Sequence, residues 1–199
     1  PDELLAKFSL DGLQKKAAVF DPKKLEWMNG QHLSRLPLDE VIPVVRRAVT
    51  RAEVPGAERL DRDPAWTAHL VEQLRVRART IEDVVRQARP YLGDVVYDEE
   101  AVAKALLKDR AASADILSAT REALAGAPAW EPEPLESALR SLADARGLAA
   151  GKIFTPLRVA LTGLSVSPGI FDVLVLVGRE RSLARIAHTL DMLSGAGPA

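Results

Sequence analysis

Apolar residues recur at helical spacing along most of this chain. Between residues 38 and 52, the inner positions of the pattern are Val41, Val44, Val45, Ala48 and Val49. A second set consists of Leu135, Leu139 and Leu142. Residues three and four apart share one face of an α-helix, so these stretches predict helices. Sustained alternation with a period of two, bounded by hairpin turns, does not occur, and the sequence therefore predicts an all-α fold.

Four predicted helix starts consist of a capping residue followed at once by proline. They are Asp21–Pro22, Asp63–Pro64, Thr155–Pro156 and Ser167–Pro168. A polar N-cap side chain accepts a hydrogen bond from the first turn, and proline suits the first helical position because it has no N–H to leave unpaired. A fifth start is predicted at Thr80–Asp83, which fits a capping box and opens a helix that ends at Pro90.

The stretch from Thr155 to Gly178 contains two of these starts. Two short apolar helices are predicted there, beginning at Thr155 and Ser167 and stopping at Gly163 and Gly178. The first N–H groups of a helix have no intrahelical partner, so each start is a place where a phosphate or a base edge could be held. Arg158 falls in the first turn of the earlier helix, where the helix dipole does not favour a cation. It either pairs with a nearby carboxylate or contacts a ligand.

Three arginines lie two positions apart near the end of the helix that opens at Asp63–Pro64. The buried stripe of this helix consists of Trp66, Leu70 and Leu74. Arg77 continues that stripe at about 100° per residue, whereas Arg75 and Arg79 point to the opposite side and are expected to be solvated. Arg77 would therefore emerge where the buried face ends, either to cap the last carbonyls or to reach a ligand.

Composition restricts the classes of protein that fit. The 199 residues are 47% hydrophobic and 28% charged, which suffices for a sizeable core and one or two domains. No apolar run has the ~18 residues of a membrane span, and signal-peptide pattern and cysteine are both absent, so we expect a cytoplasmic protein without membrane association. The histidines, His32, His69 and His188, give no metal-ligand spacing. A net charge of −1 limits any RNA contact to local arginine clusters.

Two blocks of sequence resemble bacterial glutamyl-tRNA synthetases. Residues 156–163, Pro-Leu-Arg-Val-Ala-Leu-Thr-Gly, followed by residues 167–171, Ser-Pro-Gly-Ile-Phe, are similar to the C-terminal anticodon-binding region of that family. Residues 18–30, Ala-Val-Phe-Asp-Pro-Lys-Lys-Leu-Glu-Trp-Met-Asn-Gly, preceded by Phe-Ser-Leu at 8–10, are similar to its stem-contact segment. The blocks occur in the family's order and at about its spacing, and the resemblance spans nearly the whole chain.

The resemblance implies three parts. Residues 1–37 would be the end of a stem-contact fold, residues 38–97 a first helical subdomain of the anticodon-binding domain, and residues 98–199 a second one. Related glutaminyl enzymes bind the anticodon with β-barrels instead, so the all-α prediction distinguishes the two. In the first part, Lys23 and Lys24 either contact the tRNA backbone or remain solvated.

The resemblance also assigns roles to single residues. Contacts to the first two anticodon bases would come from Arg158, Ser167, Pro168 and Ile170. Arg77 would contact the third base, which distinguishes glutamate tRNA from glutamine tRNA, although Arg75 or Arg79 could be the true counterpart. Serine and isoleucine replace the threonine and leucine of some family members, and both changes keep the chemical character of the side chain.

The family's catalytic signatures do not occur in this sequence. Neither the His-x-Gly-His motif nor the Lys-Met-Ser-Lys-Ser loop is present, nor is a nucleophile with a neighbouring base. We therefore interpret the chain as a fragment without cofactor or metal. Its parent would be a monomeric, ATP- and magnesium-dependent ligase that attaches glutamate to tRNA(Glu), and its partners would be that tRNA and the catalytic domain of the same polypeptide. The alternatives are a helical scaffold for protein partners and a small enzyme with an unrecognised site.

The missing signatures predict that this chain alone performs neither glutamate-dependent ATP–pyrophosphate exchange nor tRNA charging. Both activities can be measured on a preparation that has been freed of contaminating synthetase. Measurable exchange by such a preparation would contradict the prediction.

Overall fold

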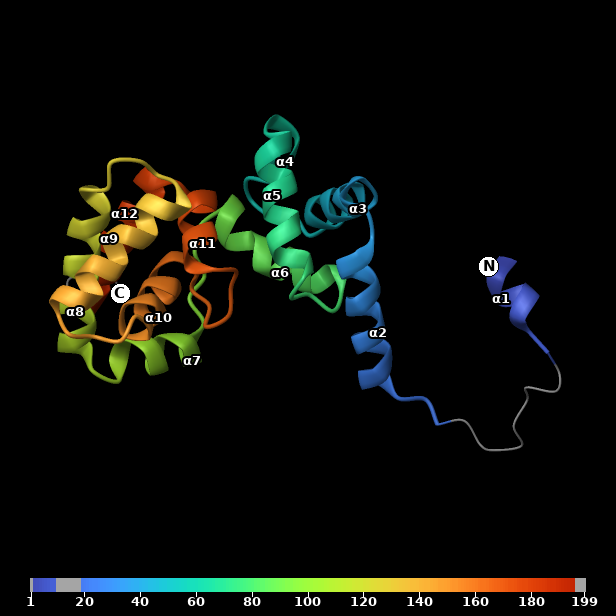
Figure 1. Ribbon diagram of the computed structural model, residues 1–199, viewed down its shortest axis with the longest axis horizontal. Coiled ribbons are helices and arrows are strands. Elements are labelled where there is room, and N and C mark those ends of the chain that lie inside the picture. The colour runs from blue at the N-terminus through green and yellow to red at the C-terminus, as the bar shows by residue number, and fades with distance from the viewer. Residues whose placement is uncertain (1, 10–18, 196–199) are drawn as a thin grey trace.

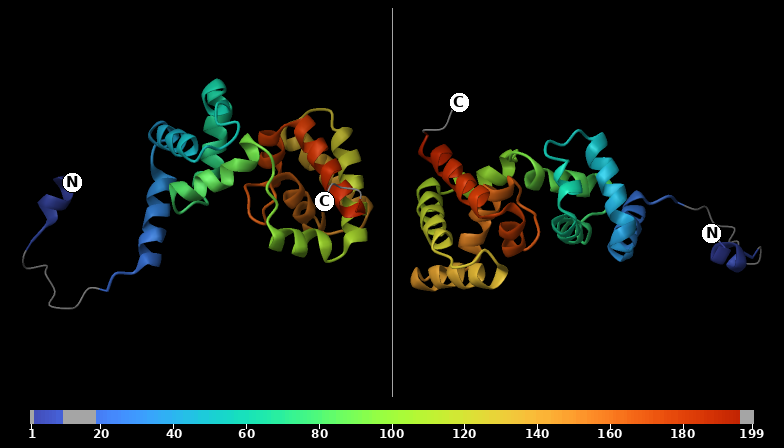
Figure 2. Two further views of the ribbon diagram at one scale, coloured as in Figure 1. Left: turned by 180° about the vertical axis from the view of Figure 1, so that it is seen from behind. Right: turned by 90° about the horizontal axis from the view of Figure 1, so that it is seen from above.

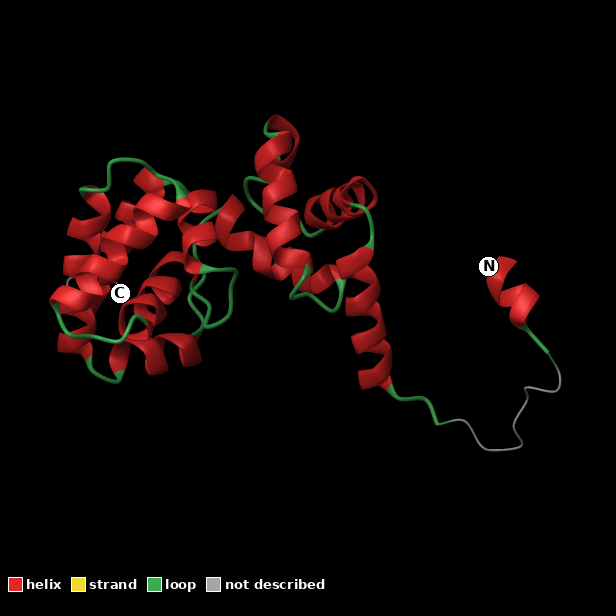
Figure 3. Ribbon diagram, in the orientation of Figure 1, coloured by secondary structure: helices red, strands yellow, loops and turns green. Residues whose placement is uncertain are grey.

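The described part of the computed structural model, residues 2–9 and 19–195, contains helices as its regular elements and no strand, as Figures 1 and 3 show. The all-α prediction is confirmed. The helices are α1 (Asp2–Lys7), α2 (Pro22–Arg35), α3 (Leu38–Arg51), α4 (Arg59–Arg62), α5 (Pro64–Arg75), α6 (Ile81–Leu92), α7 (Glu99–Val102), the π-helical turn η2 (Ala103–Leu107), α8 (Arg110–Ala125), α9 (Pro132–Ala145), α10 (Gly151–Thr162), α11 (Ile170–Val177) and α12 (Arg179–Ser194).

The helices pack in two groups. In the first helix group, α3, α5 and α6 contact one another and α4 lies on α5. In the second helix group, α8 packs against α9 and α12, and α10 contacts α8, α11 and α12. Figures 1 and 2 show the second group at one end of the molecule, with the first group between it and α2. The connector, residues 93–98, runs from α6 to α7.

The two groups meet through α5 with α11 and through α6 with α10. Polar contacts between α5 and α11 cross this junction. The indole Nε1 of Trp66 on α5 donates to the carbonyl oxygen of Leu176 on α11 at 2.9 Å. His69 Nε2 lies 3.3 Å from Asp172 Oδ1, again between α5 and α11. Buried residues of both groups belong to one continuous hydrophobic core, so the groups are in direct apolar contact as well.

Helix α2 starts as predicted and stands to one side of the first group. The carboxylate of Asp21 accepts from the N–H groups of Lys23 and Lys24 at 3.0 and 3.3 Å. Leu33 is the buried residue of this helix. Three apolar side chains, Leu25, Trp27 and Met28, are each more than half exposed. Of the expected stem-contact segment, residues 1 and 10–18 lie outside the described residues.

The predicted start of the helix that carries Arg158 is wrong. α10 begins at Gly151, four residues before Thr155, and Pro156 lies inside it. Ile153, in the added first turn, is fully buried, and this burial extends the helix beyond the proline that was expected to begin it. Arg158 therefore lies in the middle of α10 rather than in its first turn.

The predicted capping role of Ser167 is also wrong. α11 begins at Ile170, with Gly169 at its N-cap position. The hydroxyl of Ser167 instead donates to the carbonyl oxygen of Pro168 at 3.0 Å and accepts from the guanidinium of Arg158. A side chain from a neighbouring helix has taken the oxygen that a cap would need.

Gly163 ends α10 as predicted and fixes how the connector passes that helix. Its φ of 72° is left-handed, a conformation that favours glycine. A Cβ atom at this position would overlap the carbonyl oxygen of Val96. The carbonyl oxygen of Gly163 accepts from the N–H of Asp98 at 2.9 Å. The end of α10 and the connector between the groups therefore hold each other in place.

We expect Gly163→Ala to destabilise the fold more than Gly147→Ala. Both glycines have a positive φ, 72° and 61°, but an added Cβ meets nothing within 4 Å at Gly147. The control should cost about 1–2 kcal/mol from backbone strain alone, and Gly163→Ala should exceed that because the Val96 backbone must also move. Urea unfolding of both variants measures the difference, and equal losses would show that the close approach to Val96 is easily relieved.

Candidate nucleic-acid interface

The three arginines after α5 occupy different environments. Because α5 ends at Arg75, Arg77 lies in the turn between α5 and α6 and is exposed. The expectation of a solvated Arg75 is wrong. Its side chain is only 11% exposed, pairs with Glu72 at 2.5 Å and donates to the carbonyl oxygen of Leu36 at the end of α2. Arg75 is thus held by the contact between α2 and α5, which is not available to a ligand.

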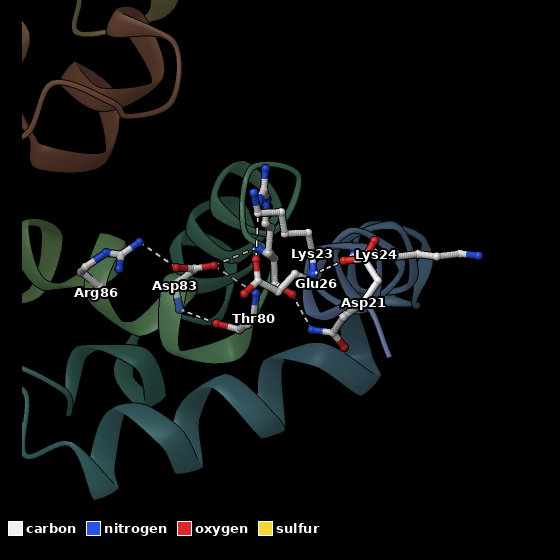
Figure 4. A network of polar contacts seen from close by, with 9 residues as sticks. Asp21, Lys23, Lys24, Glu26, Thr80, Asp83 and Arg86 are labelled. Atoms are coloured by element: carbon white, nitrogen blue, oxygen red, sulfur yellow. Dashed lines mark hydrogen bonds and ion pairs between the residues drawn. The ribbon is translucent and has the colours of Figure 1, made fainter. Parts of the chain in front are cut away.

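The turn that carries Arg77 and Arg79 is fixed by the predicted capping box at the start of α6. Thr80 Oγ1 accepts from the N–H of Asp83 at 3.1 Å, and Asp83 Oδ2 accepts from the N–H groups of Thr80 and Arg79 at 3.2 and 3.1 Å. Figure 4 shows Asp83 between Thr80 and Arg86, whose Nη2 is 2.7 Å from Asp83 Oδ1.

These contacts also keep the Asp83 carboxyl charged. Burial would raise the pKa of Asp83, but the hydrogen bonds from Arg79 and Thr80 together with the charge of Arg86 outweigh it, so the pKa lies below its usual value. The side chain of Arg79 is 65% exposed and lies 3.5 Å from Glu26 on α2, also drawn in Figure 4. Asp83 therefore orders the backbone beside Arg77, and the Arg77 side chain is not one of its hydrogen-bond partners.

A cleft of about 460 Å³ opens between this turn, the start of α7 and the α10–α11 loop, residues 163–169. Its lining residues are Arg77, Arg79, Asp83, Arg86, Gln87, Asp98, Glu100, Leu164, Ser165 and Val166. The loop side of the cleft presents an apolar surface, since Val166 is 64% exposed. The cleft thus combines cationic side chains from the first helix group with a loop of the second.

Arg77 is the arginine of this cleft that the acidic residues leave available. Asp98 caps α7 by accepting from the N–H of Ala101 at 2.8 Å, and Glu100 pairs with Lys104 at 2.5 Å. No carboxylate in the described part of the chain pairs with Arg77, whose Nη1 makes a 3.4 Å contact to the carbonyl oxygen of Gln73. An exposed guanidinium without an acidic partner is suited to bind an acceptor on a ligand.

Arg158 holds the α10–α11 loop from within. Its Nη1 donates to the hydroxyl of Ser167 and to the carbonyl oxygens of Ser167 and Pro168, the latter two at 3.2 and 2.7 Å. The interpretation that Arg158 pairs with a carboxylate is therefore wrong. Its Nε and Nη2 donate to no atom of the described residues. Burial lowers the pKa of Arg158, and the positive charge of Arg77 adds to this effect.

Of the other predicted site residues, two are buried and two are exposed outside the cleft. Pro168, within the loop, and Ile170, the first residue of α11, are both buried, and Ile170 is only 4% exposed. Lys23 and Lys24 are exposed at the start of α2 and do not line the cleft. The sequence analysis missed Val166 and Arg86. The sequence feature that could have pointed to an exposed Val166 is its position between two serines inside a loop. No sequence feature could have pointed to Arg86, because its place in the cleft depends on the orientation of α6.

The cleft has the features of a site for unpaired bases. Single-stranded RNA loops are recognised by donors that reach base edges and by aromatic or guanidinium planes on which bases stack, and the arginines of the cleft offer donors and such planes. A family model for an anticodon-binding domain matches residues 36–190, and the chain belongs to that family.

The individual relatives are ligases for one amino acid. The chain is 36% identical over 190 residues to glutamate–tRNA ligase 1 of Syntrophus aciditrophicus. The aligned part is 95% of this chain and 39% of the relative. It is 35% identical over 191 residues to the glutamate–tRNA ligase of Myxococcus xanthus. Here the aligned part is 95% of this chain and 38% of the relative. The resemblance to glutamyl-tRNA synthetases is confirmed, and the chain spans less than half of the length of these relatives.

The fold is also found in a solved structure. The crystal structure of a glutamate tRNA ligase from Elizabethkingia meningosepticum, in complex with its amino acid, matches with a TM-score of 0.79 at 23% identity. The match covers 96% of this chain and 36% of that chain. The all-α arrangement is therefore that of the corresponding part of a glutamate tRNA ligase.

We expect Ser167→Ala to loosen the α10–α11 loop without affecting the first turn of α11. The substitution removes one acceptor of Arg158 but no helix cap. Thr80→Ala is the matched control, since it removes a true N-cap and should cost about 1 kcal/mol of unfolding free energy. Amide hydrogen exchange distinguishes the two: the Asp83 amide should exchange faster in the control, whereas first-turn amides of α11 should be unchanged in Ser167→Ala. Faster exchange at those α11 amides would assign the cap to Ser167.

Proposed function

We propose that this chain is the anticodon-binding part of a glutamate–tRNA ligase and holds the anticodon of tRNA(Glu) in the cleft between its helix groups. The observation that carries the proposal is the placement of Arg77, which is exposed in that cleft and has no acidic partner among the described residues. The net charge of −1 agrees with recognition by a few positioned cations rather than by a general basic surface.

In this proposal, the two arginines have separate tasks. Arg77 reads the third anticodon base from the first helix group. Arg158 and Ser167 shape the loop that contacts the first two bases, and the free Nε and Nη2 of Arg158 supply donors to a base edge. Pro168 and Ile170 anchor the end of that loop in the core, since both are buried. Lys23 and Lys24 are exposed and contact the tRNA backbone outside the cleft.

The larger protein supplies the chemistry. The relatives are ligases of more than twice this length, so we assign glutamate activation, with its ATP and magnesium, to a catalytic domain of the same polypeptide. Among the described residues, no three histidine, cysteine or carboxylate side chains gather around one point. The exposed apolar side chains of α2, which are Leu25, Trp27 and Met28, are those that we assign to contact with the rest of that polypeptide.

We infer that the whole protein is a monomer and that it acts in the cytoplasm, where a tRNA ligase meets its substrates. In the described residues, no helix has both the length and the apolar character needed to cross a membrane.

We expect Arg77→Gln to reduce discrimination between glutamate and glutamine tRNAs more than it reduces binding. The anticodons differ at the third base, cytosine against guanine. A guanidinium offers donors only, which match the O2 and N3 acceptors of cytosine and oppose the N1 and N2 donors of guanine. A glutamine amide presents both a donor and an acceptor, so the preference for tRNA(Glu) should shrink by about 1–3 kcal/mol in competition binding.

Arg79→Gln and Arg47→Gln are the controls. Arg79 lines the same cleft but pairs with Glu26, and Arg47 is exposed on α3, away from it. Arg79→Gln should lower the affinities for the two tRNAs about equally, and Arg47→Gln should leave both affinities unchanged. Arg75 is not a suitable control, since its loss would disturb the contact with α2. An unchanged ratio for Arg77→Gln, or a larger change for Arg79→Gln, would move the role of third-base reader away from Arg77.

A further inference from the structure

Arg185 on α12 joins the ends of two helices that belong to different helix groups. Its Nη1 donates to the carbonyl oxygen of Leu161, in the last turn of α10, at 2.7 Å. Its Nη2 donates to the carbonyl oxygens of Pro90 and Gly93, at the end of α6, at 2.6 and 3.0 Å. Carbonyls in the last turn of a helix have no intrahelical donor, so one guanidinium satisfies the ends of α6 and α10 together.

Arg181, one turn earlier on α12, adds to the same junction. Its Nη1 donates to the carbonyl oxygen of Tyr91 at 3.0 Å and its Nη2 to that of Gly93 at 2.8 Å. The expected end of α6 at Pro90 is wrong, since the helix continues by two residues to Leu92, and Tyr91 in this extension supplies one of the acceptors. Three carbonyls of the first helix group are thereby bound to a helix of the second.

Within the described residues, the charge of Arg185 is not paired directly with a carboxylate, although the charge of Asp94 acts on it. No carboxylate in the described residues forms an ion pair with Arg181 or Arg185. Burial, and then the neighbouring charge of Arg181, lower the pKa of Arg185 to about 10, so it remains charged at neutral pH. The negative ends of two helix dipoles stabilise that charge. A planar guanidinium donates in fixed directions, so its bonds constrain how the two helix ends lie relative to each other.

The two helices joined by Arg185 are those that position the anticodon site. α10 carries Arg158, and α6 begins at the capping box that fixes the turn of Arg77. Resting on the proposed function, we propose that Arg185, assisted by Arg181, is a positioning residue of this site: by binding the ends of α6 and α10 together, it sets the separation between Arg77 and Arg158. A shift between the helix groups would change that separation while leaving each arginine's own surroundings intact.

The first test measures the geometry of the free protein. The chain has no cysteine, so Arg47→Cys on α3 and Ser137→Cys on α9, both exposed, place one spin label on each helix group. Arg185→Met should broaden the distance distribution between the labels. Arg179→Met is the matched control. Arg179 lies on the same helix, but its Nη2 donates to the carbonyl oxygens of Ala125 and Ala127, at 2.6 and 3.1 Å, within the second group. Its loss should leave the distribution unchanged.

The second test measures recognition in the same variants without labels. The ratio of affinities for tRNA(Glu) and for the same tRNA with guanine at the third anticodon position should fall about fivefold or more in Arg185→Met and stay constant in Arg179→Met. Arg185→Lys keeps the charge but loses the planar guanidinium. Its distance distribution and its affinity ratio should therefore lie between those of the wild type and those of Arg185→Met. If Arg185→Met does not fold, as judged by thermal unfolding, Arg181→Met and Arg185→Lys carry the same two measurements.

The outcomes separate this proposal from the proposed function. An unchanged distance distribution in the folded variants, or a broadened one with an unchanged affinity ratio, would overturn the positioning role. A wild-type chain that binds both tRNAs equally would overturn the proposed function and the positioning role with it. The spin-label result would still show, without any RNA, whether Arg185 holds the helix groups together.

Discussion

The cleft depends on the close approach of the end of α10 to the connector between the helix groups. Gly163 permits it, because its φ of 72° turns the chain where a side chain would collide with Val96. The hydrogen bond from the Asp98 N–H to the Gly163 carbonyl oxygen then places the start of α7 beside the α10–α11 loop. Without this contact, the loop and the turn of Arg77 would not face each other, and the cleft would lose one wall.

The chemistry of the cleft follows from how its charges are distributed. Equal numbers of arginines and carboxylates line it, so its total charge would not predict an affinity for RNA. The carboxylates, however, are bound by partners close in sequence, as Asp98 is by the N–H of Ala101 and Glu100 by Lys104. Local pairing within the helices thus leaves Arg77 exposed and unpaired by any described carboxylate, although the surface as a whole is nearly neutral.

Sequence alone determined the features that arise from short-range interactions. Helical periodicity, the caps at Asp21 and Asp63 and the capping box of Thr80 and Asp83 were all predicted correctly, since each involves atoms within about four residues along the chain. The resemblance carried by residues 156–163 and 167–171 was equally local, and it gave the family. The prediction for Arg77 treated residues 76 and 77 as part of the helix, whereas α5 ends at Arg75.

Tertiary structure decided the rest, because long side chains find partners that are distant in sequence. Arg75 is bound by Leu36, and Arg158 by the loop nine and ten residues ahead of it. The hydroxyl of Ser167 matched the cap pattern, yet Arg158 occupies it, and burial of Ile153 moved the start of α10. Nothing local to Arg185 indicated that it would meet the ends of α6 and α10, since that contact exists only once both helix groups are packed.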